Sequence, residues 1–300
     1  MITTLQRITS SDTQPAIHLR SERFYRVQRR LNWLLLYGIL IFWVTLLMLP
    51  VIWLLVSSFK TDAELISYPP RFFPKVWRFS NYVDVIAKYR FLTYAGRTIY
   101  LATMFMVTNV ASCSLAGYAF ARIQAPGRAY LFILMLASIM VPGIVTLIPQ
   151  FVLYTRMKII NTYWPWFLWG LAGNGYQIFL FRQFFASFPV ELEDAAAVDG
   201  CSPFRTYWQI FLPNAKPVLA VTGLFAFQWV WGDYFNQALL LTERKATLAM
   251  KLANAFVDPR GNPLVTITIA AIVIYVLPMI IVYFLGQRQI VEGIVTTGVK

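Results

Sequence analysis

The stretch ELEDAAAVDGCSPFRTYWQIFLP, residues 191–213, interrupts a chain that is otherwise apolar enough to sit in a lipid bilayer. Its first half holds good helix formers, with acidic residues near the start where the positive end of the helix dipole favours them. Asp199-Gly200 then breaks the helix, since glycine enters the left-handed conformation without steric cost. Ser202 as N-cap and Pro203 at the first helical position start a second helix, which Pro213 ends. We therefore predict a short, rigid helix-turn-helix, called the elbow below (residues 189–213).

The composition of the whole chain is that of an integral membrane protein. Of its 300 residues, 58% are hydrophobic and only 13% are charged, against about 25% charged in soluble chains. A membrane-spanning helix needs about 20 consecutive, mostly apolar residues. We predict an all-α membrane protein in which residues 31–288 form one six-helix domain. The six expected spans lie at about 31–59, 93–121, 129–155, 159–181, 214–242 and 263–287.

The charges that flank the first span set its expected orientation. Five arginines of the basic N-terminal segment, residues 1–30, lie within reach of this span, and fewer cations lie close to its other end. Loops rich in lysine and arginine stay in the cytoplasm, so we expect a cytoplasmic N-terminus. This segment suits an amphipathic helix at the membrane surface as well as it suits a solvated tail. With six spans, the elbow and the C-terminal tail, residues 289–300, are cytoplasmic too.

Several kinds of active site are absent from the sequence. His18 is the only histidine, which removes histidine metal sites and histidine-dependent triads. No G-x-x-x-x-G-K-[ST] loop occurs, so the chain has no such phosphate cradle of its own. Cys113 lies in the second span and Cys201 in the elbow, so a disulfide between them is not expected. We therefore expect that this chain has no catalytic site, metal or cofactor. The energy for its function is expected to come from another chain or from an ion gradient.

The run PVELEDAAAVDGCSPFRTYWQIFLPNAKP, residues 189–217, resembles the EAA loop of permease subunits of ABC importers, most closely those of the maltose type for carbohydrates. Its core, AA-x-x-DG with proline downstream, is a specific signal. The resemblance implies the type I ABC importer permease fold, with a cytoplasmic coupling helix that sits in a cleft on a separate ATPase subunit. The residues that it assigns to this coupling are Glu191, Glu193, Asp194, Ala195, Ala196, Asp199, Gly200, Ser202, Pro203 and Pro213.

The resemblance extends over nearly the whole chain, including LAGYAFARIQAPGR at residues 115–128 and VPGIVTLIPQF at residues 141–151. It implies a location in the bacterial cytoplasmic (inner) membrane and a second homologous permease subunit as heterodimer partner. It also implies an extracytoplasmic solute-binding protein and two ATPase subunits, which would hold ATP and Mg. Two positions depart from the family pattern: the motif glutamate is Asp194, and Cys201 replaces the usual small residue after the glycine.

Polar side chains inside the predicted spans are candidates for a translocation path. Asp233 is the one acidic residue within a span, where an ionisable group costs about 3 kcal/mol. It faces either a cavity or the outer interface among belt aromatics. Polar groups in AGNGYQ, residues 172–177, can likewise bind a solute or hold helices together. The candidate path residues are Asn174, Tyr176, Gln177, Trp229, Trp231, Asp233, Tyr234 and Asn236.

The segment ERKATLAMKLANAFVDPRGNP, residues 243–263, is too polar to span the membrane and is long for a plain connector. In the maltose-type subunit the matching loop reaches into the solute-binding protein. The resemblance therefore implies docking to an acidic face of that partner. The residues expected to contribute are Arg244, Lys245, Lys251 and Arg260.

The expected function is ATP-driven uptake of a carbohydrate by alternating access. The net charge of +13 and the basic outer loops favour an acidic oligosaccharide such as alginate fragments, but lipid head groups or an acidic binding protein would explain the charge as well. An uncharged oligosaccharide therefore stays open. The alternative is a secondary transporter that uses Asp233 as its ion site, and the single intramembrane acid and the elbow count against it. A membrane enzyme would need a cluster of acids, and the elbow has a spacing that fits docking better.

Overall fold

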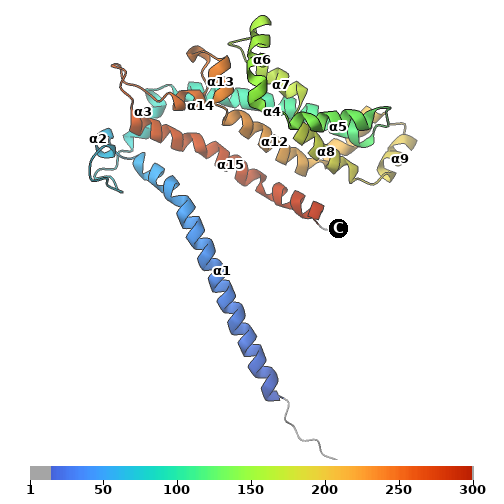
Figure 1. The fold of residues 1–300 in the computed structure, drawn as a ribbon, viewed down its shortest axis with the longest axis horizontal. Helices are drawn as coiled ribbons and strands as arrows, with labels where there is room; N and C mark the ends of the chain where they lie inside the picture. The colour runs from blue at the N-terminus through green and yellow to red at the C-terminus, as the bar shows by residue number, and fades with distance from the viewer. Residues whose placement is uncertain (1–14, 299–300) are drawn as a thin grey trace, which may run out of the picture. The chain divides into compact units, whose positions relative to one another are not determined.

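A computed structural model of the chain consists of helices joined by loops (Figure 1). It describes residues 15–298, and the side chains of residues 28–287. The helices are α1 (Pro15–Ser57), α2 (Asp62–Leu65), α3 (Ser80–Ala87), α4 (Phe91–Arg122), α5 (Arg128–Ile139), α6 (Gly143–Arg156), α7 (Trp164–Ala172), α8 (Gly175–Ala186), α9 (Glu191–Val198), α10 (Pro203–Thr206), α11 (Leu212–Asn214), α12 (Lys216–Trp231), α13 (Phe235–Leu240), α14 (Leu248–Ala253) and α15 (Val265–Gly298). Between Ser57 and Gly298 the β-structure consists of an isolated antiparallel bridge from Val257 to Pro263. The all-α prediction is confirmed.

The chain divides into two units, of which the first ends at Val56 and consists mainly of α1. The stretch Gln28–Ser57 is long and apolar enough to cross a membrane. Apolar residues occupy all sides of it, as expected for a helix surrounded by lipid and not for one at the surface of a soluble core. The predicted basic segment 1–30, apart from its last three residues, and the predicted tail 289–300 lie outside the part of the chain whose side chains are described.

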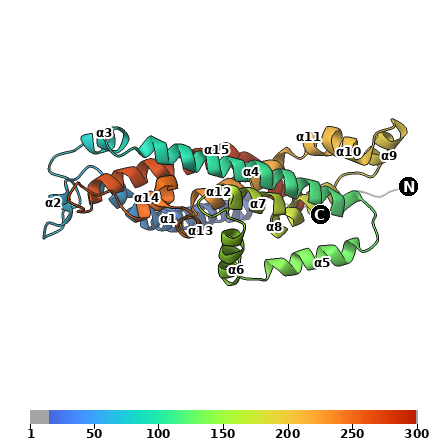
Figure 2. The same cartoon turned by 90° about the horizontal axis from the view of Figure 1, so that it is seen from above.

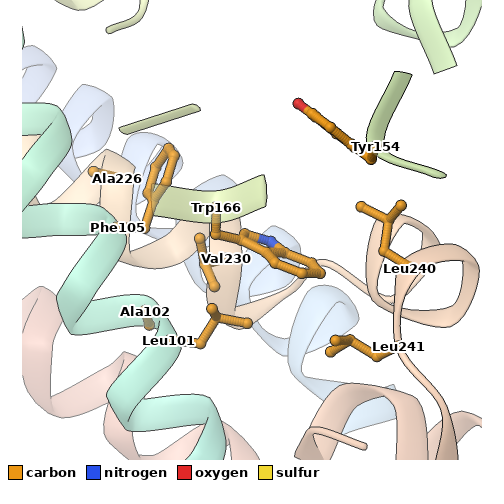
Figure 3. Packing of buried hydrophobic residues seen from close by; sticks show 9 residues of the cluster. All are labelled: Leu101, Ala102, Phe105, Tyr154, Trp166, Ala226, Val230, Leu240 and Leu241. Atoms are coloured by element: carbon orange, nitrogen blue, oxygen red, sulfur yellow. The ribbon is translucent and has the colours of Figure 1, made fainter. Parts of the chain in front are cut away.

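In the second unit, Ser57–Lys300, the long helix α4 is the central element. Three buried clusters follow one another along it. Phe91 packs with α14 and α15, Phe105 packs with α7 and α12, and Tyr118 packs with α8 and the end of the elbow. The core is therefore a row of contacts along one helix and not a single centre. Figure 3 shows the middle cluster, in which the Trp166 ring lies between Val230 and Leu240.

Three predicted spans appear as single helices, the first of them within α1, and the others are broken. Residues 91–122 and 265–287 each form one apolar helix, in agreement with predicted spans 93–121 and 263–287. Predicted span 129–155 consists of α5 and α6, which meet at an angle of 97°. The break lies at Pro142, because the residue before a proline is pushed out of the helical conformation.

Predicted span 159–181 is broken between α7 and α8 at Gly173, which has φ +75° and ends α7. Predicted span 214–242 covers α12 and α13, with a break at residues 232–234. The segment Pro203–Asn214 meets α12 at 83°, with prolines at 213 and 217 around the bend. Among the described residues, three helices are long and apolar enough to cross a membrane, or up to five if each bent pair is one span. Six spans therefore stay a prediction.

The polar segments of the second unit gather at opposite ends of α4. Figure 2 shows α9, α10 and α11 at one end and α2, α3 and α14 at the other. Asp62 of α2 joins that second end to α15, because its Oδ1 accepts hydrogen bonds from the Thr266 N–H and hydroxyl at 2.9 Å each. The elbow and the segment 243–263 therefore lie at different ends of the unit, as they must if they face different sides of a membrane.

Gly117 sets the distance between α4 and α8. A Cβ atom at this position would lie 2.4 Å from Phe181 Cβ and 3.0 Å from the Arg182 backbone nitrogen. We expect Gly117→Ala to force the two helices apart and to lower the free energy of unfolding by about 1–3 kcal/mol. Gly223→Ala is the matched control, since the nearest atom there, Met106 Sδ, lies 3.8 Å away. Thermal unfolding of the detergent-purified chains measures both, and equal unfolding temperatures would contradict the expectation.

Candidate functional site

The first half of the elbow forms as its sequence predicts. Helix α9 starts with three acidic residues in its first turn and ends at Asp199. Gly200 follows with φ +75°. Its N–H donates to Ala197 O at 3.0 Å, and the Cys201 N–H donates to Ala196 O at 2.9 Å. This is the paired hydrogen-bond pattern of a Schellman cap, which satisfies the last carbonyls of the helix and fixes the turn.

The second half of the elbow begins as predicted and ends differently. Ser202 Oγ accepts a hydrogen bond from the Arg205 N–H at 3.3 Å, and Pro203 occupies the first helical position. The helix then widens into a π-helical turn over Tyr207–Phe211. Pro213 does not end it, because α11 continues to Asn214 before the chain bends into α12. The π turn was not predicted, since local sequence signals do not mark one.

The elbow presents apolar side chains outward. Of its three consecutive alanines only Ala196 is buried, at 2% exposed, while its neighbours on either side are open. Several large apolar residues of the same segment are exposed, and contiguous exposed apolar surface on a protein marks a binding site for a partner. Those residues are Val190, Leu192, Val198, Phe204 and Trp208. Among the predicted coupling residues, Glu191, Asp194, Ala195, Asp199, Gly200, Ser202, Pro203 and Pro213 are also exposed.

Arg122, at the end of α4, joins the elbow to the rest of the unit. Its guanidinium donates to Phe185 O at 3.1 and 2.7 Å, donates to Phe188 O, and lies 5.3 Å above the ring of Phe211. Its Nε lies 3.6 Å from Glu193 Oε1, and its side chain is 8% exposed. One buried cation therefore connects α4, the end of α8, the start of α9 and the π turn. The sequence analysis did not single out Arg122, although an arginine at the end of an apolar span can be recognised in the sequence.

Glu193 and Ala196 are the two predicted coupling residues that are not exposed. The Glu193 carboxyl faces the base of the elbow and Arg122. Its Oε1 is buried and accepts no hydrogen bond from the described residues. Burial raises the pKa of this carboxyl, against the opposing attraction of Arg122, and the nearby charge of Asp194 raises it further. The arrangement favours the uncharged acid more than a free glutamate does. Glu193 therefore belongs to the base of the elbow and not to its outward surface.

A cavity of about 710 Å³ lies beside the middle of α4. Its walls come from α4, α6, α12, α13 and the junction between α7 and α8. Five of the eight predicted path residues line it: Asn174, Tyr176, Gln177, Trp229 and Asn236. Other lining residues, which the sequence reasoning did not single out, include Phe105, Asn109, Thr146, Gln150, Trp169, Phe225 and Phe235.

The other three predicted path residues do not line this cavity. Trp231 is buried and stacks on Tyr275, with ring centroids 5.3 Å apart. Asp233 Oδ1 accepts hydrogen bonds from the backbone N–H and side-chain amide of Asn236 at 3.0 and 3.1 Å, so that it caps the first turn of α13. Tyr234 precedes α13 and is exposed. Asp233 thus has a local structural partner in the break that follows α12.

The break between α7 and α8 is held by α4. Cys113 is buried, and its sulfur accepts a hydrogen bond from the Asn174 N–H at 3.1 Å. Ser112 Oγ donates to Leu171 O at 2.6 Å. Backbone groups at a break inside a span need such partners, because lipid offers none. The sequence analysis considered Cys113 only for disulfide pairing and missed its contact with the break between α7 and α8.

The segment 243–263 is folded and packed. Leu248 and Phe256 are buried in the cluster at the start of α4. Two of the four predicted docking cations make contacts within the chain: Lys245 Nζ donates to Asn161 O at 2.7 Å, and Lys251 Nζ lies 3.2 Å from Glu243 Oε1. Arg244 and Arg260 are exposed, and Arg260 lies in a turn closed by Asp258. Hydrogen bonds from Asn262 and neighbouring backbone N–H groups lower the pKa of that aspartate.

Comparison with known proteins agrees with this architecture. The model of a family described as binding-protein-dependent transport system inner membrane component matches residues 109–291. A putative ABC transporter permease protein of Caldicellulosiruptor sp. is 30% identical over 262 residues, which are 86% of this chain and 94% of that relative. A diacetylchitobiose uptake system permease protein of Streptomyces coelicolor is 28% identical over 270 residues, 87% of this chain and 87% of that relative.

One solved structure has the same fold. It is a bacterial ABC transporter involved in the import of the acidic polysaccharide alginate, and its chain superposes with a TM-score of 0.74 at 24% sequence identity. The match covers 90% of the present chain and 98% of the other. The type I ABC importer permease fold predicted from the sequence is confirmed.

Proposed function

Since the chain belongs to the family of binding-protein-dependent transport system inner membrane components, we propose that it is one of the two membrane-spanning subunits of an ATP-driven carbohydrate importer. The observation that supports this most directly is the elbow. It is a capped, rigid turn with exposed apolar side chains, at one end of a helical unit that holds a cavity near its middle. Such a surface suits a partner protein that moves the elbow as one body.

The proposed mechanism is alternating access without chemistry on the solute. ATP, bound with Mg on two ATPase subunits, would close the ATPase dimer and move the segment Asp194–Gly200. Arg122 would pass this movement to α4 and α8, because it bonds the start of the elbow to the ends of both helices. The cavity beside α4 would then open toward the outer side and receive the solute from its binding protein. Hydrolysis would reset the helices.

The assembly that this mechanism needs is a heterodimer of permeases with two ATPase subunits and a solute-binding protein. The second homologous permease would close the cavity on the side that this chain leaves open. Both termini and the elbow would face the cytoplasm, which fits the basic residues before the first span. Arg244 and Arg260 are exposed residues of the segment 243–263 and would meet the binding protein. Helix α14 of this segment lies at the end of the unit opposite to the elbow (Figure 2).

A carbohydrate is the proposed solute because amide and aromatic side chains line the cavity together. Aromatic faces pack against the C–H surfaces of sugar rings, and amides bond their hydroxyl groups. The Streptomyces relative takes up diacetylchitobiose and the solved relative imports alginate, so sugars with and without charge occur among proteins of this fold.

The test is uptake into proteoliposomes that contain this chain with its co-expressed partner subunits. We expect uptake of a labelled oligosaccharide to require ATP and the solute-binding protein and to persist when ionophores dissipate every ion gradient. Asp233→Asn should leave the need for ATP unchanged, since Asp233 caps α13. Gradient-driven uptake by the chain without ATPase subunits, abolished by Asp233→Asn, would instead establish the secondary-transporter alternative.

A further inference from the structure

We propose that Gln237 is a positioning residue that joins the segment 243–263 to the wall of the cavity beside α4. Through this side chain, docking of the solute-binding protein on the segment would move the part of the wall formed by α12 and α13. The inference rests on the proposed function and adds the residues that connect two of its sites. The observations that support it are the complete burial of Gln237, the direction of its two hydrogen bonds and its place next to the cavity.

Gln237 lies beside the break in predicted span 214–242. It is in the first turn of α13, directly after Asn236, which lines the cavity. Its side chain reaches back across the break, and its Nε2 donates to Val230 O in α12 at 2.9 Å. Backbone carbonyl groups at a break within a span need such partners, because lipid offers none. Gln237 therefore helps to fix how α13 continues from α12.

The same amide joins this break to the segment 243–263. The hydroxyl of Thr247, which precedes α14, donates to Gln237 Oε1. Since Val230 O can only accept a hydrogen bond, the amide nitrogen must face it, and the amide oxygen must face Thr247. Gln237 and Thr247 are both completely buried, at 0% exposed. The link is therefore shielded from water and has a single orientation.

A buried amide at this position specifies an arrangement that apolar packing would not. A leucine side chain of similar size would fill the space without the cost of removing an amide from water. The two hydrogen bonds of Gln237 offset that cost only while α12, α13 and the start of α14 keep one mutual arrangement. Apolar contacts alone are not directional. The amide thus makes the three elements move together.

Both ends of this link lie next to residues of the cavity wall. Asn236 precedes Gln237 and Trp229 precedes Val230, and both Asn236 and Trp229 line the cavity. The Trp229 side chain is 45% exposed, so it is open to a solute. A displacement of Thr247 would therefore shift an amide and an aromatic ring of the wall together.

Other hydrogen bonds hold the rest of the segment in shape. The Leu248 N–H donates to Thr98 Oγ1 of α4 at 2.8 Å, and the Phe256 N–H donates to Thr268 Oγ1 of α15 at 3.0 Å. All four residues are buried. A partner docked on the exposed arginines of the segment would therefore move it as one body, with Gln237 as the connection to the break between α12 and α13.

The experiment titrates the purified solute-binding protein onto the importer, reconstituted in proteoliposomes with its co-expressed partner subunits, and follows ATP hydrolysis. The readouts are the ratio of stimulated to basal hydrolysis and the concentration of binding protein that gives half of the stimulation. Thr247→Val removes the hydroxyl and keeps the shape of the side chain. We expect it to lower the ratio at least about fivefold, as for typical coupling between sites, and to change the half-stimulating concentration less than about twofold. Thr247→Ser keeps the hydroxyl and should stay close to wild type.

A double variant separates the link from folding. Gln237→Leu combined with Thr247→Val replaces both partners of one hydrogen bond by apolar side chains, a change that is often nearly neutral for stability. Val230 O keeps the Asp233 N–H, at 3.3 Å. The double variant should therefore unfold close to the wild-type temperature and still lack stimulation. Its loss of stimulation should not exceed that of Thr247→Val, because both changes break the same link.

Thr222→Val is the matched control for the loss of a buried hydroxyl. Thr222 is 0% exposed, and its hydroxyl donates to Val218 O within α12 at 2.7 Å, so it joins no second element through this bond. This variant should keep the wild-type ratio.

Three results would overturn the inference: wild-type stimulation of Thr247→Val or of the double variant, a loss seen only as a higher half-stimulating concentration, or an equal loss in Thr222→Val. Each of them would leave the proposed importer in place, because the wild-type complex would still respond to its binding protein. A wild-type complex that the binding protein does not stimulate would instead contradict the proposed function, and the inference would fall with it.

Discussion

Gly200→Asp is expected to abolish copurification of the ATPase subunit with the intact membrane domain. A Cβ atom at Gly200 would meet no atom within 4 Å, so the substitution does not clash within the chain. The residue has φ +75°, which aspartate tolerates better than most residues. The fold should survive, while an unpaired charge is added to the turn that docks on the partner. Because burying such a charge is costly, we expect a loss of at least about tenfold in ATPase recovered by affinity purification.

Gly200→Asn is the matched control, since asparagine has the size of aspartate, tolerates the same backbone conformation and has no charge. It should retain most of the ATPase. Gly261→Asp makes the charged change at another exposed glycine with φ +84°, in the segment 243–263 at the opposite end of the unit, and should retain all of it. If Gly200→Asp copurifies with as much ATPase as the wild type does, the docking role of the elbow is wrong.

Arg122→Ala is expected to destabilise the protein and to uncouple the elbow. The change leaves the carbonyl groups of Phe185 and Phe188 and the carboxyl of Glu193 without their buried partner. Removing one member of a buried charged network costs on the order of 3 kcal/mol. Thermal unfolding of the purified chain, followed by tryptophan fluorescence, should show a lower midpoint. In the assembled importer, stimulation of ATP hydrolysis by the solute-binding protein should be lost.

Arg122→Lys separates charge from geometry. A lysine keeps the positive charge but lacks the planar fork that lets Arg122 donate to two carbonyls, so stability and stimulation should fall between those of wild type and Arg122→Ala. Arg128→Ala is the matched control, because Arg128 is half-buried and its guanidinium donates only to Ile123 O, at 2.9 Å, among the described hydrogen bonds. It should change the unfolding midpoint little. An unchanged midpoint for Arg122→Ala would refute this account of the buried network.

Gly200 and Arg122 lie on one proposed route by which a movement of the elbow reaches the cavity. Gly200 fixes the shape of the docking turn through its Schellman cap, and Arg122 ties the base of that turn to α4 and α8. Helix α8 begins at the cavity, directly after its N-cap Asn174, and ends beside Arg122, at Ala186. The same short helix therefore contacts the proposed solute site at one end and the base of the elbow at the other. In the proposed mechanism, a shift of the elbow would reach the cavity through Arg122 and α8.

The features of this protein that depend on local chemistry could be predicted from its residues alone. The helical class and membrane location follow from apolar stretches whose backbone must bond internally in lipid. The elbow was predicted from Asp199-Gly200, which ends α9, and from Ser202-Pro203, which starts α10. Both pairs affect only the backbone within a few residues of their own positions. The sequence also identified the polar residues around Asn174 and Trp229, because polar groups in an apolar span are conspicuous.

The packing of the helices fixes which polar residues share a cavity and which have partners within the chain, and this could not be predicted from the sequence. Asp233 and Asn236 are three residues apart, yet Asn236 lines the cavity and Asp233 caps α13. Arg122 and Cys113 bond to residues about 60 positions away in the chain, which no local pattern reveals. The helix-breaking residues Pro142 and Gly173 can be recognised in the sequence. The 97° angle between α5 and α6, and the hydrogen bond from Ser112 to the Leu171 carbonyl at the end of α7, depend on how the helices pack. Local signals fix where a helix starts and stops, whereas packing fixes what each side chain meets.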